Sequence, residues 1–402
     1  MKYDVVVVGG GPAGLSAAYS AAKAGIRVAV LEKSKEIGYP IHTSGGSWIE
    51  ELKQLDIPEK FMNPIYEGFF YSAKERAEFT YTSPPSCVLD VRGLYQYLAE
   101  LAAAEGAEIF VNTTVLEPLK KDGKLRGVKA RRHGKLVEIS AGVTIDASGI
   151  SAIIGRKTGL FSGFKRYGVG AEYDLFAPHW PCGRAVFLLG KKFVPSGYAW
   201  IFPHKNQRVR LGVGLIYPDS TGDPKNYLDQ ILNNKELFNG EFTNVSCLEY
   251  HVGRIPGQRP LQKTVADGLL VAGDAGGLIS ILLGEGIRFA IDIGRMAGET
   301  AAEAIRAERI DSRFLIKYER RWQKKYRRSF FLAATIHDRI AQYSDHDWDE
   351  KIRALAKVPA DLIPPILKGA FTRQNLFAVM KASPALITLK ILNTISSILK
   401  NA

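Results

Sequence analysis

The chain has 402 residues, of which 46% are hydrophobic and 24% are charged, with 39 glycines and 19 prolines. This composition is typical of a globular protein and excludes a largely disordered or fibrous chain. Because single hydrophobic cores stop growing at roughly 250–300 residues, the length predicts two or three domains. Fifty-four Lys and Arg residues against 41 Asp and Glu residues give a formal charge of +13. This surplus favours anionic partners such as phosphate, nucleic acid or an acidic membrane surface.

The cysteines and the apolar segments bear on the compartment. The three cysteines, Cys87, Cys182 and Cys247, are widely spaced, which fits neither a disulfide framework nor a metal site. The first residues run directly into an apolar strand, so we expect no signal peptide. No uncharged apolar run reaches the roughly 18 residues of a membrane-spanning helix. We therefore expect a cytoplasmic protein, with any membrane contact peripheral and on the inner face.

The first thirty residues carry the pattern of a dinucleotide-binding unit. A β-branched run at 3–8 predicts a buried parallel strand, followed by Gly-Gly-Gly-Pro-Ala-Gly at 9–14. A small-residue helix at 13–24 and a second strand at 27–31 follow, and the strand ends at Glu32. Strand, G-x-G-x-x-G, helix, strand and acidic residue form the dinucleotide-binding fingerprint.

Each residue of the fingerprint has a physical task. Gly9 permits the tight turn, Gly11 lets the backbone approach a pyrophosphate, and Gly14 lets helix and strand pack closely. The helix N-terminus supplies N–H donors and a partial positive charge for phosphates. Glu32 is predicted to accept hydrogen bonds from an adenosine ribose. The fingerprint alone leaves open whether the nucleotide is NAD or FAD.

Two later strands bear on that choice. The segments 143–149 and 269–277 are apolar strands that run into turns, and Gly286 opens a long helix through residue 306. A strand that ends in Gly-Asp before a helix N-terminus can hold a ribityl chain with its carboxylate, here Asp274. The helix N–H groups are then near an isoalloxazine carbonyl. This arrangement favours FAD.

Four separated motifs carry a family resemblance. They are Gly9–Gly14 with Glu32, Arg92 at a helix start, Asp146-Ala147-Ser148-Gly149, and Gly273-Asp274 followed by Gly284-Glu285-Gly286-Ile287. Over about residues 1–310 the chain resembles the FAD-dependent oxidoreductases built on the p-hydroxybenzoate hydroxylase plan. Within them, Tyr198-Ala199-Trp200-Ile201-Phe202-Pro203 matches the Y-x-W-x-F-P signature of geranylgeranyl reductases.

The resemblance implies FAD as the cofactor and no metal. Many members carry a cysteine in a P-x-x-C-x-x-G loop, whereas Thr43 occupies that slot in residues 40–46 of this chain. The residues that the resemblance places around FAD are Gly9, Gly11, Pro12, Ala13, Gly14, Glu32, Lys33, Thr43, Ser44, Gly46, Arg92, Val115, Gly149, Gly273, Asp274, Gly286 and Ile287.

The predicted fold class is α/β. A Rossmann-like FAD-binding domain (1–65, 85–162 and 258–312) is expected to interleave with an antiparallel-sheet substrate domain (66–84 and 163–257), followed by a helical C-terminal region (313–402). The FAD domain should carry a three-stranded meander at 113–140 with a turn at Asp122-Gly123. The strands predicted for the substrate sheet are 167–173, 185–189, 199–202 and 209–217.

The resemblance further implies saturation of isolated carbon–carbon double bonds in a prenyl chain. Tyr198, Trp200, Phe202 and Pro203 are the predicted substrate-binding residues. Because strand side chains alternate, the three aromatic residues share one face and Ile201 points away. An isolated double bond must be held over flavin N5 in a dry pocket and must receive a proton.

No residue is a certain proton donor. His42, Tyr198 and His251 are the candidates, and each residue type is more often structural. The expected substrate is a prenyl lipid or a prenyl diphosphate. The single dinucleotide site is assigned to FAD, so the electron donor is ferredoxin, NAD(P)H or another external reductant. The sequence leaves open the chain length, the number of bonds reduced and the oligomeric state.

Two late segments are basic. Residues 313–331 interleave eight Lys or Arg residues with aromatic residues, which fits either an anionic head-group site or a solvated helix with its aromatic stripe in the core. Residues 371–400 alternate apolar turns with cations, which fits a membrane interface, a lipid tunnel or an ordinary closing helix. No recognised nucleic-acid-binding fold accompanies the charge, so we expect no nucleic-acid partner.

Other functions are compatible with the same plan. A flavin monooxygenase or aromatic hydroxylase would consume oxygen and NAD(P)H when its substrate is added. Halogenases show W-x-W-x-I-P where this chain has Tyr198–Pro203, which argues against them. A non-catalytic prenyl carrier of the Rab escort or GDI type need not retain FAD, so a colourless protein would favour it.

Overall fold

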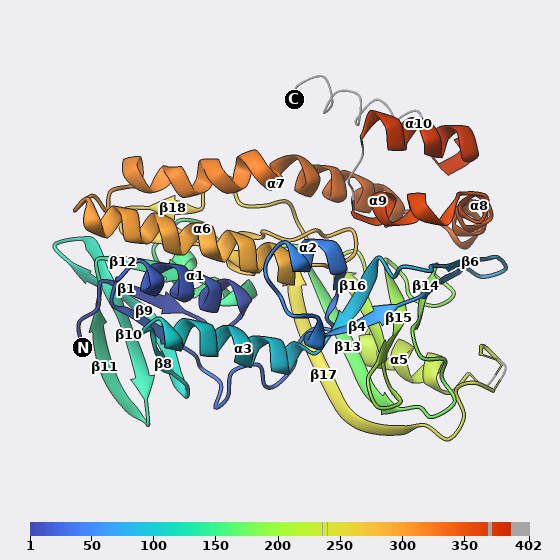
Figure 1. Cartoon of the computed structure of the whole chain (residues 1–402), viewed down its shortest axis with the longest axis horizontal. Helices are drawn as coiled ribbons and strands as arrows, with labels where there is room; N and C mark the ends of the chain where they lie inside the picture. The colour runs from blue at the N-terminus through green and yellow to red at the C-terminus, as the bar shows by residue number, and fades with distance from the viewer. Residues whose placement is uncertain (235, 239, 369–371, 387–402) are drawn as a thin grey trace.

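In this computed structural model, two β-layers lie side by side and a layer of helices runs across both (Figure 1). The structure describes residues 1–234, 236–238, 240–368 and 372–386. Of the predicted basic segment 371–400, residue 371 and residues 387–400 lie outside the described residues.

A six-stranded sheet forms the first layer, with the strand order β18-β19-β12-β1-β2-β8. All its pairs are parallel except β18–β19. Every residue of β1 and β2 is buried, as expected for parallel strands covered on both faces. Its strands are β1 (Val5–Val8), β2 (Val28–Leu31), β8 (Glu108–Phe110), β12 (Val143–Asp146), β18 (Val265–Ala266) and β19 (Leu269–Val271).

Helices cover one face of this sheet, and a three-stranded meander with a short helix covers the other. The predicted meander and its turn are confirmed, since Asp122 and Gly123 both have positive φ between β9 and β10. The covering helices are α1 (Pro12–Lys23), α3 (Val91–Ala104) and α6 (Ile287–Arg306). The other face carries β9 (Thr113–Lys121), β10 (Lys124–Arg132), β11 (Lys135–Ser140) and α4 (Ile153–Lys157).

The second layer is a seven-stranded sheet in the order β17-β13-β16-β15-β14-β5-β6. All its pairs are antiparallel except β14–β5, which is parallel. Strands β5 and β6 come from an earlier part of the chain and join the sheet beside β14. Its strands are β5 (Glu67–Tyr71), β6 (Arg76–Thr80), β13 (Tyr167–Phe176), β14 (Arg184–Leu189), β15 (Gly197–His204), β16 (Arg208–Tyr217) and β17 (Ser246–Pro256). Helix α5 (Pro224–Leu232) packs on one face. The predicted mixed fold class is confirmed.

A small sheet joins the two layers. Its order is β3-β7-β4, with β3 (Gly46–Trp48), β4 (Met62–Ile65) and β7 (Ser86–Leu89), and helix α2 (Ile49–Lys53) follows β3. Side chains from β4 and β7 pack with the aromatic residues of β15 in one buried cluster. The loop before β3 is thereby held against the face of the seven-stranded sheet opposite to α5.

The C-terminal helices cross the top of both layers in Figure 1. They are α7 (Ser312–Ile340), α8 (Asp345–Leu355), α9 (Ile363–Lys368) and α10 (Arg373–Ala382). The aromatic stripe of α7 is mostly core, with Tyr318, Trp322 and Phe330 buried. Lys317, Arg321 and Lys325 pair with acidic residues of α6. The aromatic side chains of 313–331 therefore follow the solvated-helix interpretation.

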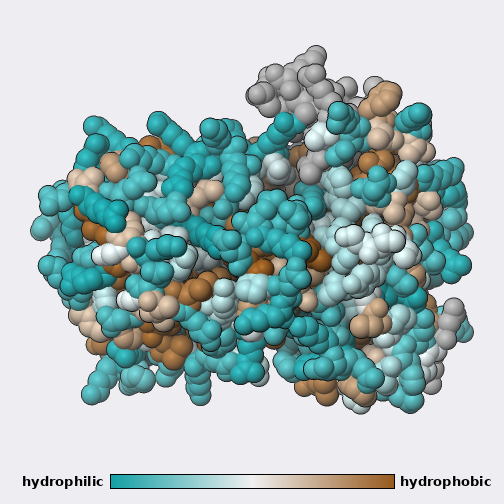
Figure 2. All heavy atoms as spheres, viewed as in Figure 1, coloured by the Kyte–Doolittle hydropathy of each residue, from teal (hydrophilic) through white to brown (hydrophobic). Residues whose placement is uncertain are grey.

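The molecular surface in the view of Figure 2 is mostly hydrophilic, with hydrophobic atoms visible near the middle of the face. Among the described residues, no helix has the length and apolarity needed to cross a bilayer.

Two glycines set the spacing of α1 and α6. A Cβ atom at Gly294 would collide with the carbonyl oxygen of Ala13, and one at Gly298 would collide with that of Ala17. The two helix backbones therefore touch directly. Because α1 begins at the nucleotide-binding turn, this contact fixes where α6 lies relative to that turn.

We expect Gly298→Val to lower stability by roughly 1–3 kcal/mol, because the added carbons must separate α1 from α6. Thermal unfolding and flavin retention on gel filtration measure the effect. Ala307→Val, at the exposed end of α6, is the control and should change neither. A Gly298→Val protein as stable as wild type would contradict direct backbone contact.

Candidate functional site

The glycine-rich turn has the geometry that a pyrophosphate needs. Gly9 has φ +107°, and a Cβ there would strike the backbone of Ala147. A Cβ at Gly14 would strike the carbonyl of Gly9, so strand and helix are in contact. By contrast, a Cβ atom on Gly11 would meet no other atom within 4 Å. The turn is therefore closed toward the protein and open where a phosphate would lie.

Glu32 lies beside this turn at the end of β2. Its Oε2 accepts from the backbone N–H of Gly10 at 2.7 Å, and its Oε1 accepts from that of Ser34 at 2.7 Å. These bonds orient the carboxylate next to the glycine turn. Each carboxylate oxygen keeps a further lone pair for a ribose hydroxyl.

Asp274 supplies an independent test of whether FAD fits. It sits in the turn after β19, and none of the described residues donates a hydrogen bond to its half-buried carboxylate. Burial raises its pKa to about 6. Its Oδ1 lies 3.3 Å from the point where a Cβ atom on Gly286 would be, and Gly286 is the N-cap residue of α6. A carboxylate without a donor beside a helix N-terminus fits a ribityl chain and a flavin ring.

The other predicted cofactor residues occupy varied settings. Arg92 begins α3, is exposed and pairs with Glu36 at 2.5 Å. Val115 is buried in the core under the meander, and Lys33 is exposed. Gly149 has φ +65° and follows the Asp146 turn. Their contacts with FAD stay a prediction.

A cavity lies against one face of the seven-stranded sheet. The loop at 42–48, the sheet face and residues 283–287 line it. Among the predicted residues, the cavity brings together His42, Thr43, Ser44, Gly46, Tyr198, Trp200, Phe202, His251, Gly286 and Ile287. Pro203 lies outside this lining, and its carbonyl accepts a hydrogen bond from Asn63 Nδ2 at 2.7 Å.

The aromatic wall (Tyr198, Trp200 and Phe202) forms part of this lining. The expected alternation is observed, since Trp200 and Phe202 pack toward the small sheet while Ala199 and Ile201 pack toward α5. The Trp200 indole occupies the space that a Cβ of Gly212 would need, and it also approaches Gly214. The ring therefore lies flat across β16, with glycines beneath it.

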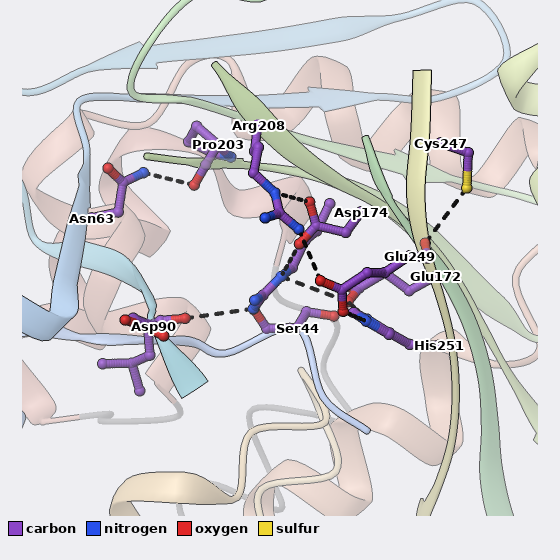
Figure 3. Close-up of polar contacts among 12 residues, drawn as sticks. Ser44, Asn63, Asp90, Glu172, Asp174, Pro203, Arg208, Cys247, Glu249 and His251 are labelled. Atoms are coloured by element: carbon purple, nitrogen blue, oxygen red, sulfur yellow. Dashed lines mark hydrogen bonds and ion pairs between the residues drawn. The ribbon is translucent and has the colours of Figure 1, made fainter. Parts of the chain in front are cut away.

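A charge network (Glu172, Asp174, Arg208, Arg210, Glu249 and His251) occupies the same sheet face, with Arg208 and Glu249 half-buried and the other four buried. Its members sit two residues apart on β13, β16 and β17, so their side chains share one face (Figure 3). Arg208 Nε donates to Asp174 Oδ1 at 2.7 Å, and Nη2 donates to Glu249 Oε1 at 3.2 Å. Arg210 Nη1 donates to the carbonyl of Ser44 at 2.7 Å. Arg210 therefore ties the sheet to the loop at 42–48, which lines the cavity.

His251 is held between two carboxylates. Its Nδ1 lies 3.3 Å from Glu172 Oε1, and its Nε2 lies 3.0 Å from Glu249 Oε2. Burial alone would lower the pKa of His251, but hydrogen bonds to the two carboxylates outweigh burial and raise it. Burial alone would likewise raise the pKa of Glu172, whereas the bond with His251 and the charge of Arg210 lower it. With His251 protonated, three cations balance three carboxylates.

The three candidate proton donors differ in how their polar atoms are engaged. Tyr198 donates its hydroxyl to the carbonyl of Leu283 at 2.6 Å, and burial raises its pKa. Both nitrogens of His251 face carboxylates. His42 Nδ1 lies 2.9 Å from the carbonyl of Val252, and its Nε2 has no partner among the described residues. The role of each residue in proton transfer stays a prediction.

Sequence reasoning missed every member of the charge network except His251. The signal was present as Glu-Tyr-Asp at 172–174, Arg-Val-Arg at 208–210 and Glu-Tyr-His at 249–251, three strands with charges at alternate positions. Alternating charges in one strand suggest solvent exposure. Opposite charges on three strands instead satisfy one another when the strands pair.

A second, mostly apolar cavity adjoins the first. Helices α7 to α10 and β14 supply much of its lining. The two cavities meet at one partition beside the aromatic wall. Seven residues line both of them: Phe70, Phe187, Gly197, Tyr198, Leu283, His337 and Leu367.

Comparisons with known proteins bear on this site. Residues 4–160 match the family model of FAD-dependent oxidoreductases, and residues 180–255 match that of the geranylgeranyl reductase catalytic domain. A digeranylgeranylglycerophospholipid reductase of Methanothermobacter thermautotrophicus is 32% identical over 88% of this chain and 92% of its own. Another from Methanocaldococcus jannaschii is 33% identical over 88% and 91%.

Solved structures agree with these matches. A geranylgeranyl bacteriochlorophyll reductase-like protein of Thermoplasma acidophilum superposes with a TM-score of 0.86 at 25% identity, covering 99% of both chains. A flavin-dependent brominase shares the fold, with a TM-score of 0.71 at 18% identity over the full length of both chains. The fold and the nucleotide cradle thus define an FAD-dependent oxidoreductase. Within that class, the chain belongs to the geranylgeranyl reductase family.

We expect Asp274→Ala to weaken FAD binding by about tenfold or more, because a hydrogen bond to a charged group contributes roughly 1.5–3 kcal/mol. Titration of the apoprotein with FAD, followed by flavin absorbance, gives the dissociation constant. Asp361→Ala, at an exposed acidic position, is the control. Wild-type affinity in Asp274→Ala would contradict the proposed ribityl contact.

The raised pKa of His251 predicts a pH-dependent contribution to stability. Because the folded pKa exceeds the ordinary value of 6.5, the contribution is complete below about pH 6.5 and is lost as pH rises through the folded pKa. The stability difference between wild type and His251→Asn, from denaturant unfolding, should therefore be larger at about pH 6 than at about pH 9. His179→Asn, at an exposed site, corrects for the substitution itself. A constant difference would contradict a charged His251.

Proposed function

We propose that this chain saturates carbon–carbon double bonds in the geranylgeranyl chains of an archaeal-type glycerophospholipid precursor. The observation that carries the proposal is the pair of adjoining, largely apolar cavities that runs from Gly46 and Gly286 past Tyr198 to helices α7 to α10. A long flexible hydrocarbon requires extended, largely apolar space, which these two adjoining cavities offer on either side of Tyr198. The relatives that bear the reductase name support this substrate class.

The residues of the chain define what each part of the site contributes. Gly9 to Gly14, Glu32 and Asp274 would hold FAD, and reduced FAD supplies the hydride for the double bond. The aromatic wall orients an apolar chain and excludes water from the reacting carbon atoms. A proton must reach the second carbon, for which His42, Tyr198 and His251 are the candidates.

The remaining partners are also proposals. Ferredoxin, NAD(P)H or another reductant would reduce the bound flavin. Peripheral membrane contact is supported by Arg320, Lys324 and Arg327, which are exposed on α7 and form no ion pair among the described residues. Spaced four and three residues apart, they lie on one helix face, where anionic lipid would attract them.

Under anaerobic conditions, we expect digeranylgeranylglycerol phospholipid or geranylgeranyl diphosphate to reoxidise the reduced flavin of the protein. Flavin absorbance follows reoxidation, and mass spectrometry should show a gain of two hydrogens for each bond reduced. The fully saturated lipid is the control and should leave the flavin reduced.

The opposite result would be flavin that stays reduced with both prenyl substrates and no gain in product mass. Oxygen and NAD(P)H consumption on addition of an aromatic substrate would then identify a monooxygenase. A protein that purifies without flavin and binds prenyl lipid unchanged would identify a carrier.

A further inference from the structure

The Trp200 indole is the largest member of the aromatic wall, and only part of its position is explained by packing. Its ring lies over glycines, which offer space but no side chain to clasp it. Its Nε1 donates to Glu172 Oε2 at 2.9 Å, across β16 to the neighbouring strand β13. Tyr198 and Phe202 flank the ring along β15, with ring centroids 5.4 Å and 6.2 Å away, and one hydrogen bond anchors it to β13.

Glu172 is itself held from three strands. Its Oε1 lies 3.3 Å from His251 Nδ1 on β17 and 4.0 Å from Arg210 Nε on β16. Asp174, Arg208 and Glu249 complete the charged surroundings. Glu172, Asp174, Arg210 and His251 are only 2–6% exposed. A charge-assisted hydrogen bond to an acceptor held in this way restricts the orientation of the donor, the Trp200 indole.

The same carboxylate faces the cavity. Glu172, Trp200, His251 and Gly214 all contribute to its lining. If the indole tilted away from Gly212, its ring would move into the cavity and narrow it. The hydrogen bond on Nε1 therefore controls the space left for a chain.

We propose that Glu172 is a positioning residue, which pins the Trp200 indole flat on Gly212 and Gly214 and thereby shapes the channel that presents each double bond. This inference rests on the proposed function for its substrate. Its structural part, the indole position, holds whatever substrate the cavity takes.

The test uses full-length holoenzyme and the variants Glu172→Ala, Glu172→Gln and Gly212→Ala. Glu172→Ala removes the acceptor, whereas Glu172→Gln keeps an acceptor oxygen and removes the charge. Gly212→Ala adds a Cβ that the ring cannot tolerate and changes no charge. Glu249→Gln is the matched control, because it removes a charge from the same network without touching Trp200.

The first readout needs no substrate. Near-ultraviolet circular dichroism of wild type minus Trp200→Phe defines the Trp200 signal. We expect Glu172→Ala and Gly212→Ala to lose this signal, and Glu172→Gln and Glu249→Gln to keep it. Retention of the signal in Glu172→Ala or Gly212→Ala would overturn the proposal. If Glu172→Ala does not fold, Glu172→Asp replaces it, because its shorter side chain cannot reach Trp200 Nε1, and the same loss of signal is expected.

The second readout is turnover with digeranylgeranylglycerol phospholipid. We expect Glu172→Ala and Gly212→Ala to lower kcat/KM about tenfold or more and to release more partly reduced products, with Glu172→Gln restoring most of both. A Glu172→Gln enzyme as impaired as Glu172→Ala, at equal thermal stability, would overturn the positioning role. Wild-type enzyme that reduces no prenyl substrate would overturn the proposed function, while the dichroism result would still decide the indole position.

Discussion

Arg210 is the residue on which the site's geometry depends most. Its guanidinium is buried between the seven-stranded sheet and the loop at 42–48, and it donates to the Ser44 carbonyl at 2.7 Å. Toward the sheet it approaches Asp174 at 3.5 Å and Glu172 at 4.0 Å. One cation thus ties the seven-stranded sheet to the loop at 42–48, so the two cannot separate without leaving buried charge exposed or unpaired.

Buried charge of this kind is costly to assemble, because each ion loses its hydration. The pairing of charges offsets that cost, because three cations face three carboxylates and most of the contacts are hydrogen bonds. Removal of one member leaves an unpaired charge in a poorly solvated place. The network is therefore better understood as a device that defines one arrangement of β13, β15, β16 and β17 than as a source of net stability.

Much of the fold was predictable because its signals are local. The glycine turn at 9–14, the β-branched strand at 5–8 and the alternating strands at 167–217 each specify their own structure, and all are observed. The parallel pair β5–β14 was not predictable, because it joins segments more than 100 residues apart through a register that no local pattern encodes. The buried stripe of α7 needed knowledge of what lies beneath it, namely α6.

The site divides in the same way. Trp200 was found from a signature and its face from strand alternation, whereas its partner Glu172 became visible only once β13 was placed two strands away. The nucleotide cradle could be predicted residue by residue, since G-x-G-x-x-G fixes backbone geometry. The continuation of the cavity beneath α7 to α10 could not, because it is bounded by helices whose sequences show only general amphipathic character.

The central claim is that the isoalloxazine and an apolar chain meet between the nucleotide cradle and the Trp200 indole. A crystal structure of the holoenzyme with a saturated diprenylglycerol phospholipid tests this most directly. The account predicts electron density for the ring beside Gly46 and Gly286, with a hydrocarbon chain in contact with Trp200. Density for the chain outside both cavities, or a flavin ring turned away from Trp200, would contradict it.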